Sequence, residues 1–351
     1  MITHVDVSGY EQVLRIERPE LGLLAFIAVH STAFGPAAGG LRMRPYDDEA
    51  DALDDVLRLA RGMTYKNVAA NLPLGGGKAV IIGDPHCEKT PEKLLAVAEV
   101  IESLGGAYWT AEDMGMGPDD MELIASRTAY VAGRSNGAYA SGDPSPVTAA
   151  GVFAAIKATY RRRFRHDIAG AAIAIQGLGH VGWSLAEKLA GAGCRLIVAD
   201  TDRTRVDRAR AAFGCAAAEP DEIIYVEADL FAPCAIGGVL NDETIPRLSA
   251  RAIAGAANNQ LAEPRHGRML DARGVLYAPD YVANGGGIIN VAAEINRIDN
   301  REDWVAGKLA NLSATLDAIF DEAEREGLAP PDAADQMVER RLHDASLKIA
   351  S

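Results

Sequence analysis

The stretch AAIAIQGLGHVG, residues 171–182, decides the fold of this chain. Its first half is almost continuously apolar, which is typical of a strand buried on both faces. Its second half carries Gly177, Gly179 and Gly182 in a G-x-G-x-x-G pattern. Because this pattern ends a strand and begins a helix, it predicts a turn that binds the pyrophosphate of a dinucleotide.

The residues after this turn indicate which dinucleotide is bound. His180 and Val181 begin the next helix, whose free N-terminal amides would hold the pyrophosphate. The following strand, CRLIVAD, ends in Asp200, whose carboxylate would bind the ribose hydroxyls and repel a 2′-phosphate. The sequence therefore predicts NAD rather than NADP, although Arg203 and Arg205 could weaken that preference.

Strands and helices alternate regularly after residue 171, which predicts an α/β fold with a parallel sheet covered on both faces. The chain has 351 residues, a length that suits two domains, and the segment 133–146 has the composition of a linker. We predict an N-terminal α/β substrate-binding and oligomerisation domain over residues 1–135 and a Rossmann-type NAD domain over residues 136–325, with a cleft between them. Helices over about 326–351 can pack back on the first domain.

The composition disfavours several classes of partner. The formal net charge is −14, whereas nucleic acids and anionic membranes attract basic surfaces. The one basic cluster, residues 161–166, is interpreted as a solvated helix end. No apolar run approaches the ~20 residues of a membrane span, and the N-terminus lacks a signal-peptide core. The four scattered cysteines are interpreted as reduced thiols of a cytoplasmic protein rather than as a disulfide framework. Neither they nor the seven histidines have metal-ligand spacing, so we predict no metal.

A second glycine-rich stretch, GGGKAVIIGDP at residues 75–85, raises the question of what Lys78 does. A phosphate-binding P-loop is disfavoured, because Leu72 and Ala79 stand where that motif needs a glycine and a Ser or Thr. A surface lysine is the simple alternative. The apolar run after Lys78 reads as an interior strand, however, and a lysine that is desolvated there would have a lowered pKa and could act as a base.

Two further charged residues accompany Lys78. Lys66 ends an amphipathic helical pattern in GMTYKN, and Asp113 lies in TAED. Two lysines and a carboxylate near glycine-rich loops suit a substrate that has its own carboxylate, since one lysine can bind that group and the other can act as the base.

The chain resembles the superfamily of glutamate, leucine, phenylalanine and valine dehydrogenases, and most of all its leucine and phenylalanine branch. The resemblance runs over nearly the whole length and is carried by these segments: GPAAGGLRM (35–43), GMTYKN (62–67), LGGGKAVIIGDP (74–85), TAEDMG (110–115), GDPSPVTAAGVF (142–153), QGLGHVG (176–182), DLFAPCA (229–235), AGAANNQL (254–261) and LYAPDYVANGGGIINV (276–291).

The resemblance implies a role for each matching residue. Lys78 and Asp113 match the catalytic lysine and aspartate, and Lys66 matches the lysine that binds the substrate carboxylate. Further positions are implied to bind the substrate: Gly39, Gly40, Ala38, Ala111, Asn258, Ile288 and Val291. Thr148 and Asn284 match positions near the nicotinamide. In one departure, Gly285 stands where the family usually has an alanine in its Asn-Ala-Gly-Gly turn.

The implied reaction is the reversible, NAD-dependent oxidative deamination of an L-amino acid to its 2-oxo acid and ammonia, in a homo-oligomer that is a dimer or an octamer. The glutamate branch has a lysine at the position of Ala38 and a serine at that of Val291, so an apolar substrate is expected, either branched or aromatic. Two alternatives remain: a dehydrogenase of another small acid, which would want a histidine base, and a catalytically silent NAD-binding oligomer.

Overall fold

The computed structural model describes residues 1–350, and they divide into two compact units. The first unit comprises Met1–Asp143, Asn290–Trp304 and the segment from Arg341 onward. The second comprises Pro144–Ile289 and Val305–Arg340. The chain therefore leaves the first unit twice, after Asp143 and after Trp304, and returns to it twice.

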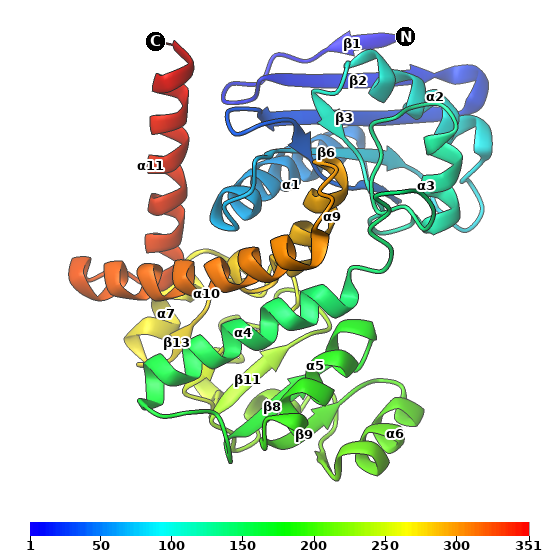
Figure 1. The fold of residues 1–351 in the computed structure, drawn as a ribbon. Helices are drawn as coiled ribbons and strands as arrows, with labels where there is room; N and C mark the ends of the chain where they lie inside the picture. Colours follow the sequence, from blue (N-terminus) through cyan, green and yellow to red (C-terminus); the bar gives the residue numbers. More distant parts are fainter. Residues whose placement is uncertain (351) are drawn as a thin grey trace. The chain divides into compact units, whose positions relative to one another are not determined.

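The first unit is built on one mixed sheet (Figure 1). The order of its strands is β1-β2-β3-β6-β4-β7, and β5 also pairs with β6. The strands are β1 Ile2–His4, β2 Gln12–Arg18, β3 Leu23–Ser31, β4 Ala37–Ala38, β5 Leu41–Arg44, β6 Gly75–Ile82 and β7 Tyr108–Trp109. The helices in this part of the chain are α1 Glu49–Ala69, α2 Pro91–Ser103 and α3 Pro118–Ala125, with a short 3-10 turn at Pro19–Leu21.

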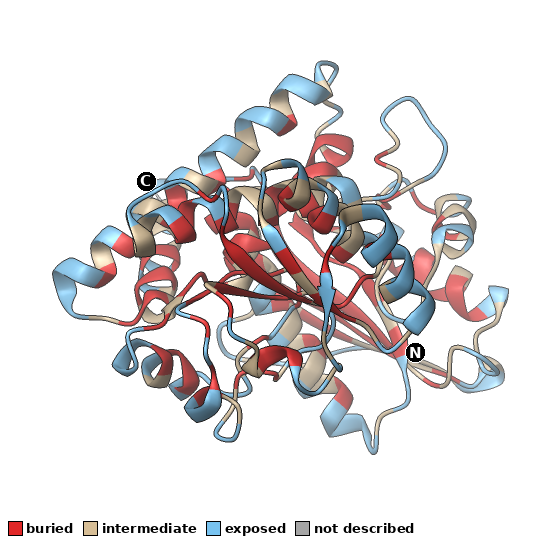
Figure 2. Cartoon of the chain, turned by 90° about the horizontal axis from the view of Figure 1, so that it is seen from below, coloured by how far each residue is buried: buried red, intermediate tan, exposed pale blue. Residues whose placement is uncertain are grey.

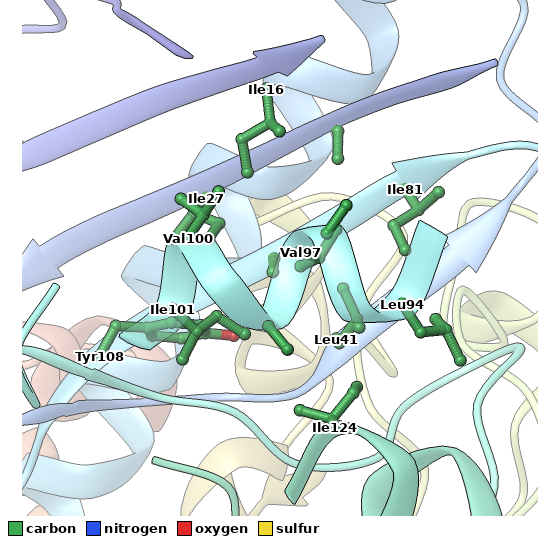
Figure 3. Packing of buried hydrophobic residues seen from close by; sticks show 14 of the residues in the cluster. Ile16, Ile27, Leu41, Ile81, Leu94, Val97, Val100, Ile101, Tyr108 and Ile124 are labelled. Carbon is green, nitrogen blue, oxygen red and sulfur yellow. The ribbon is translucent and has the colours of Figure 1, made fainter. Parts of the chain in front are cut away.

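Successive side chains of a strand point to opposite faces of the sheet, and both faces of this sheet are buried. Ile16, Ile27 and Ile81 pack with α2 and α3 in one apolar cluster, which is shown in Figure 3. Phe26 and Val80 point the other way and pack against α1. Since β6 is buried on both faces, every second residue of this strand, Lys78 included, faces α1.

The helix α1 lies very close to β6, and glycine makes this approach possible. A Cβ on Gly76 would lie 2.0 Å from the backbone nitrogen of Thr64 in α1. Asn67 of the same helix donates a hydrogen bond from its side-chain amide to the Gly75 carbonyl oxygen. The glycine-rich start of β6 thus holds the last turns of α1, which include Lys66, against the sheet.

The second unit has a parallel sheet with the order β10-β9-β8-β11-β12-β13. This is the strand order of a Rossmann fold, whose switch point lies between β8 and β11. Its strands are β8 Ala172–Gln176, β9 Arg195–Ala199, β10 Ala216–Ala217, β11 Leu230–Pro233, β12 Ala252–Ile253 and β13 Leu276–Tyr277. Its helices are α4 Ser145–Phe164, α5 His180–Gly191, α6 Arg203–Phe213, α7 Arg265–Ala272 and α8 Asp280–Ala283, with 3-10 turns at Ile223–Tyr225 and Ile245–Arg247. Figure 2 shows how burial concentrates along the strands.

Three more helices follow: α9 Gly286–Ile295, α10 Arg301–Glu326 and α11 Pro330–Ala350. Within the first unit, α9 fixes the loop that follows Val131. The Glu294 carboxylate accepts hydrogen bonds from the backbone N–H groups of Gly133 (2.8 Å) and Ser141 (3.0 Å). Arg301 donates to the Ala140 carbonyl oxygen at 2.7 Å. Among residues 1–350, no helix combines the length and the apolar character that crossing a membrane requires.

Candidate active site

Lys78 and Asp113, which the sequence placed in separate motifs, meet in the first unit. The Lys78 ammonium donates a hydrogen bond to Oδ2 of Asp113. The side chain of Lys78 is only 7% exposed and that of Asp113 is 21% exposed. The pair therefore has little water around it, and each charge depends on the other for stabilisation.

The surroundings shift the pKa of both groups. Burial lowers the pKa of Lys78, and this effect outweighs the attraction of Asp113, which opposes it. Burial alone would raise the pKa of Asp113, but the charges of Lys78 and Arg42 outweigh burial and the net direction is downward. The arrangement thus favours a lysine that can lose its proton more easily than an ordinary lysine.

The backbone around Asp113 leaves no room for side chains. A Cβ on Gly40 would lie 2.7 Å from the Glu112 carbonyl oxygen and 2.9 Å from the Asp113 Cβ. A Cβ on Gly39 would lie 1.9 Å from the Gly77 carbonyl oxygen. Gly40 therefore brings the chain between β4 and β5 close to the segment that carries Asp113, and Gly39 brings it close to β6.

The other predicted residues of the first unit lie on neighbouring elements. Ala38 is buried on β4, in register with Gly76 of β6. Ala111 accepts a hydrogen bond at its carbonyl oxygen from the N–H of Leu41, at 2.8 Å. Lys66 is half-buried in the last turn of α1. Val291 is half-buried on α9, and Ile288, which belongs to the second unit, precedes it by one helical turn.

The predicted nucleotide turn has the geometry that a pyrophosphate requires. Gly177 has φ +97°, which a residue with a side chain rarely adopts. A Cβ on Gly182 would lie 2.0 Å from the Gly177 carbonyl oxygen. Gly179 caps the N-terminus of α5, which begins with His180 and Val181, and nothing lies within 4 Å of where its Cβ would be. The space that a phosphate needs at this helix end is therefore open.

A cavity of about 570 Å³ continues from this turn along the carboxyl ends of β8, β9 and β11. Asp200 lines it and accepts hydrogen bonds from the N–H groups of Leu178 (2.6 Å) and Asp202 (2.8 Å). Other lining residues were not identified from the sequence, because they lie on irregular loops: Pro220, Asp221, Tyr225, Ile236 and Asn241. Both the position at the switch point and the size of the cavity fit a dinucleotide.

A second group of predicted cofactor residues lies elsewhere in this unit. Asn284 donates a hydrogen bond from its side-chain amide to Oδ1 of Asn258 at 2.8 Å. The Asn284 Oδ1 atom is buried, and within residues 1–350 it has no hydrogen-bond partner. Thr148 is close to the turn after Asn284, since a Cβ on Gly287 would lie 2.7 Å from its hydroxyl oxygen. A buried acceptor without a donor fits the carboxamide of a nicotinamide.

Two comparisons of the sequence bear on these sites. The family model described as "Glu/Leu/Phe/Val dehydrogenase, dimerisation domain" matches residues 11–130, and the model described as "Glutamate/Leucine/Phenylalanine/Valine dehydrogenase" matches residues 201–347. Leucine dehydrogenase of Bacillus cereus is 48% identical over 346 residues, which is 98% of this chain and 93% of the relative. The chain belongs to this dehydrogenase family.

Other relatives and a solved structure of the dehydrogenase family agree. Phenylalanine dehydrogenase of Caldalkalibacillus thermarum is 44% identical, over 97% of this chain and 93% of the relative. The crystal structure of L-tryptophan dehydrogenase from Nostoc punctiforme has a TM-score of 0.85 and 42% identity, covering 96% of this chain and 97% of that one. The predicted superfamily, its leucine and phenylalanine branch, and the α/β fold are therefore confirmed. The protein is an amino-acid dehydrogenase, an oxidoreductase that acts on CH–NH2 groups with a nicotinamide cofactor.

One charged residue near Asp113 was missed as a site residue. Arg42 places Nη2 at 3.5 Å from Oδ1 of Asp113 and Nη1 at 3.0 Å from Oδ2 of Asp55. The sequence contains a pattern that could have indicated it: if residues 41–43 form a strand, the arginine between the apolar residues Leu41 and Met43 points to the opposite face from theirs.

Proposed function

We propose that this dehydrogenase catalyses the reversible, NAD-dependent oxidative deamination of an apolar L-amino acid to the 2-oxo acid and ammonia. The observation that carries the proposal is the largely buried contact between Lys78 and Asp113, since it joins two groups that can exchange a proton in a site with little water. The names of relatives, which include leucine, phenylalanine and L-tryptophan dehydrogenases, support an apolar substrate.

In this proposal, Lys66, Lys78 and Asp113 each have one task. Lys66 binds the α-carboxylate of the amino acid as a point charge. A bound nicotinamide would supply the acceptor for the hydride that leaves the substrate Cα. Lys78 in its neutral form takes a proton from the water that attacks the imino carbon, and Asp113 passes a proton to the nitrogen so that ammonia leaves. Because the two side chains are in contact, the Lys78 ammonium can return a proton to Asp113 directly.

The cofactor that we propose is NAD, bound through the turn of Gly177, Gly179 and Gly182. Asp200 supports NAD over NADP, because its carboxylate lines the cavity at the end of β9, where a 2′-phosphate would meet a second negative charge. Asp221 lines the same cavity and adds to that repulsion. Arg205 lies 3.7 Å from Asp200 and offsets part of the charge. Asn284 and Thr148 would hold the nicotinamide end, with His180 and Val181 beside the pyrophosphate.

The side-chain pocket that we propose for the substrate is apolar. The residues that we propose to contact the substrate are Ala38 on β4, Ala111 after β7, Ile288 and Val291 on α9, and Asn258. None of these side chains carries a charge that could pair with the second carboxylate of glutamate. One methylene changes discrimination by only about 1–3 kcal/mol in such pockets, so we expect several branched or aromatic amino acids to react. We further propose a cytoplasmic homo-oligomer that assembles through the first unit, since that unit matches a dimerisation domain.

The test is the formation of NADH, followed at 340 nm with leucine, valine, isoleucine, phenylalanine, tryptophan and glutamate at alkaline pH. We expect reduction with the apolar amino acids, little with glutamate, and a clear preference for NAD over NADP. A preference for glutamate would contradict the apolar pocket. No turnover with any amino acid, together with intact NAD binding, would contradict the roles of Lys66, Lys78 and Asp113.

A further inference from the structure

Arg42 lies in the middle of β5, where its neighbours decide the direction of its side chain. Leu41 and Met43 are fully buried and belong to the cluster that packs with α2 and α3. Arg42 is paired in register with Val80, which faces α1. Since paired residues of neighbouring strands point to the same side, the Arg42 guanidinium lies on the α1 face together with Lys78.

The guanidinium bridges two carboxylates on that face. One nitrogen lies 3.0 Å from Oδ2 of Asp55 on α1, and the other lies 3.5 Å from Oδ1 of Asp113. Lys78 occupies the other oxygen, Oδ2, of Asp113. The Asp113 carboxylate is thus held between two cations, one on each oxygen, and the Met114 N–H also donates to Oδ1 at 2.6 Å.

The far end of this bridge is fixed as well. Asp55 accepts a hydrogen bond from the Tyr46 hydroxyl at 2.8 Å and another from Arg58 at 2.6 Å. Asp55 is only 10% exposed, so these bonds lie in a place where each lost partner is costly. Arg42 therefore has one firm attachment, to Asp55, and one looser one, to Asp113.

A purely structural role does not account for this arrangement. The Arg42 side chain is 14% exposed, its Nε is buried without a hydrogen-bond partner in the described part of the chain, and a second cation, Lys78, binds the same carboxylate. Apolar residues at such sites are often as stabilising as buried ion pairs, or more so. Stability therefore does not explain the positive charge, whereas an effect on Lys78 and Asp113 does.

We propose that Arg42 is a positioning residue for the deamination: Asp55, which Tyr46 holds in turn, keeps Arg42 in place, and Arg42 orients the Asp113 carboxylate that Lys78 contacts. The inference rests on the proposed function and extends it to a residue whose ion-pair partners are Asp55 and Asp113. Arg42 acts on the reaction through Asp113, which it contacts, and through the effect of its charge on Lys78.

The charged and titratable groups around this centre come from several elements. They are Lys78 on β6, Arg42 on β5, Asp113 itself, Tyr108 on β7, Asp55 and Arg58 on α1, and Tyr46 in the segment before α1. Arg42 disfavours the protonated form of Lys78, whereas Asp55 favours it. Removing one or the other charge therefore changes the protonation of Lys78 in opposite directions.

The experiment compares the pH profiles of kcat/KM for Arg42→Gln and Asp55→Asn with that of the wild type. In Arg42→Gln, we expect the acidic limb to move to higher pH by about one unit, because Lys78 holds its proton more tightly. In Asp55→Asn, we expect the limb to move to lower pH, since the charge of Arg42 is then uncompensated. The substrate amine titrates equally in every variant, so differences between the profiles belong to the enzyme.

Two more variants separate charge from geometry. Arg42→Lys keeps the charge but cannot bridge two carboxylates, so we expect an unshifted limb with kcat lowered about tenfold and KM changed less. Arg15→Gln is the matched control, because Arg15 also bridges two carboxylates of the first unit, Glu17 and Glu49, at a site without a proposed role. We expect Arg15→Gln to change neither the pH of the acidic limb nor kcat.

The outcomes distinguish this inference from the proposed function. If the wild type does not oxidise amino acids, the proposed function fails and the variants are not compared. If the wild type is active and both limbs stay in place, or move in the same direction, Arg42 has no positioning role. Urea denaturation of each variant, followed by circular dichroism, shows whether the first unit, which contains Arg42 and Asp55, is folded. If Arg42→Gln does not fold, the direction of the shift in Asp55→Asn decides alone.

Discussion

The ammonium of Lys78 contacts the carboxylate of Asp113, although one side chain belongs to a central strand and the other to a loop after β7. The contact lies on the face of the sheet that packs against α1. It turns a buried lysine, which would be costly alone, into half of a pair that can pass a proton back and forth.

Replacing this lysine should abolish turnover but leave the fold intact. We expect Lys78→Ala to lower kcat for leucine or phenylalanine by a factor of about a thousand or more, because the base is lost. NADH binding, measured by fluorescence, should be almost unchanged, since the nucleotide cavity belongs to the second unit. Lys89→Ala, which removes a lysine paired with Asp120 in the same unit, is the control and should keep its activity.

The activity should depend on pH with a definite sign. Burial lowers the pKa of Lys78, and only the neutral amine accepts a proton. The rate of oxidative deamination should therefore rise with pH and reach its half-maximum below pH 10.5, the ordinary lysine value. A profile of kcat measured at saturating substrate and NAD tests this, and a decline of the rate over the same range would contradict it.

The glycines of β6 set the distance between the sheet and α1. Gly76→Ala would drive a methyl group into the backbone of Thr64, and we expect it to lower the free energy of unfolding by about 3 kcal/mol. Gly62→Ala is the matched control in α1, where no atom lies within 4 Å of the new methyl group. We expect the control to raise stability by roughly 0.5–1 kcal/mol, because alanine is the better helix former. Urea denaturation measures both.

The carboxylate of Glu294 should determine how firmly the segment 133–141 is held. In Glu294→Ala the backbone N–H groups of Gly133 and Ser141 lose a charged acceptor, and we expect a loss of about 3 kcal/mol in stability. Amide hydrogen exchange should accelerate at those two residues first. Glu302→Ala, at an exposed position of α10, should change neither quantity.

The choice of cofactor should respond to Asp200. Asp200→Asn keeps an acceptor for the Leu178 N–H but removes the negative charge. We expect the ratio of kcat/KM for NAD to that for NADP to fall about tenfold or more, because the 2′-phosphate is no longer repelled. An unchanged ratio would move the source of discrimination to Asp221.

The fold could be predicted from the sequence because the patterns that indicate it lie close together in the chain. The turn at Gly177, the alternation of strands and helices and the family segments all lie within short windows. The contact between Lys78 and Asp113 follows from the sheet, which no local pattern describes. Arg42 was overlooked because an arginine on a short strand resembles an ordinary surface residue, until the register with Val80 assigns it to a buried face. Glu294 gave no signal, since its partners are backbone groups far away in the chain.

The hydrogen bonds of Glu294 also constrain the order of events on the ribosome. The segment 133–141 needs an acceptor that is synthesised only after most of the second unit has emerged, because Glu294 follows it by more than a hundred positions. The first unit cannot be finished as an autonomous folding module, although its sheet can form early. A nascent chain released before residue 294 would keep this segment open to proteases. A stalled-ribosome series that spans Glu294 would show when the protection begins.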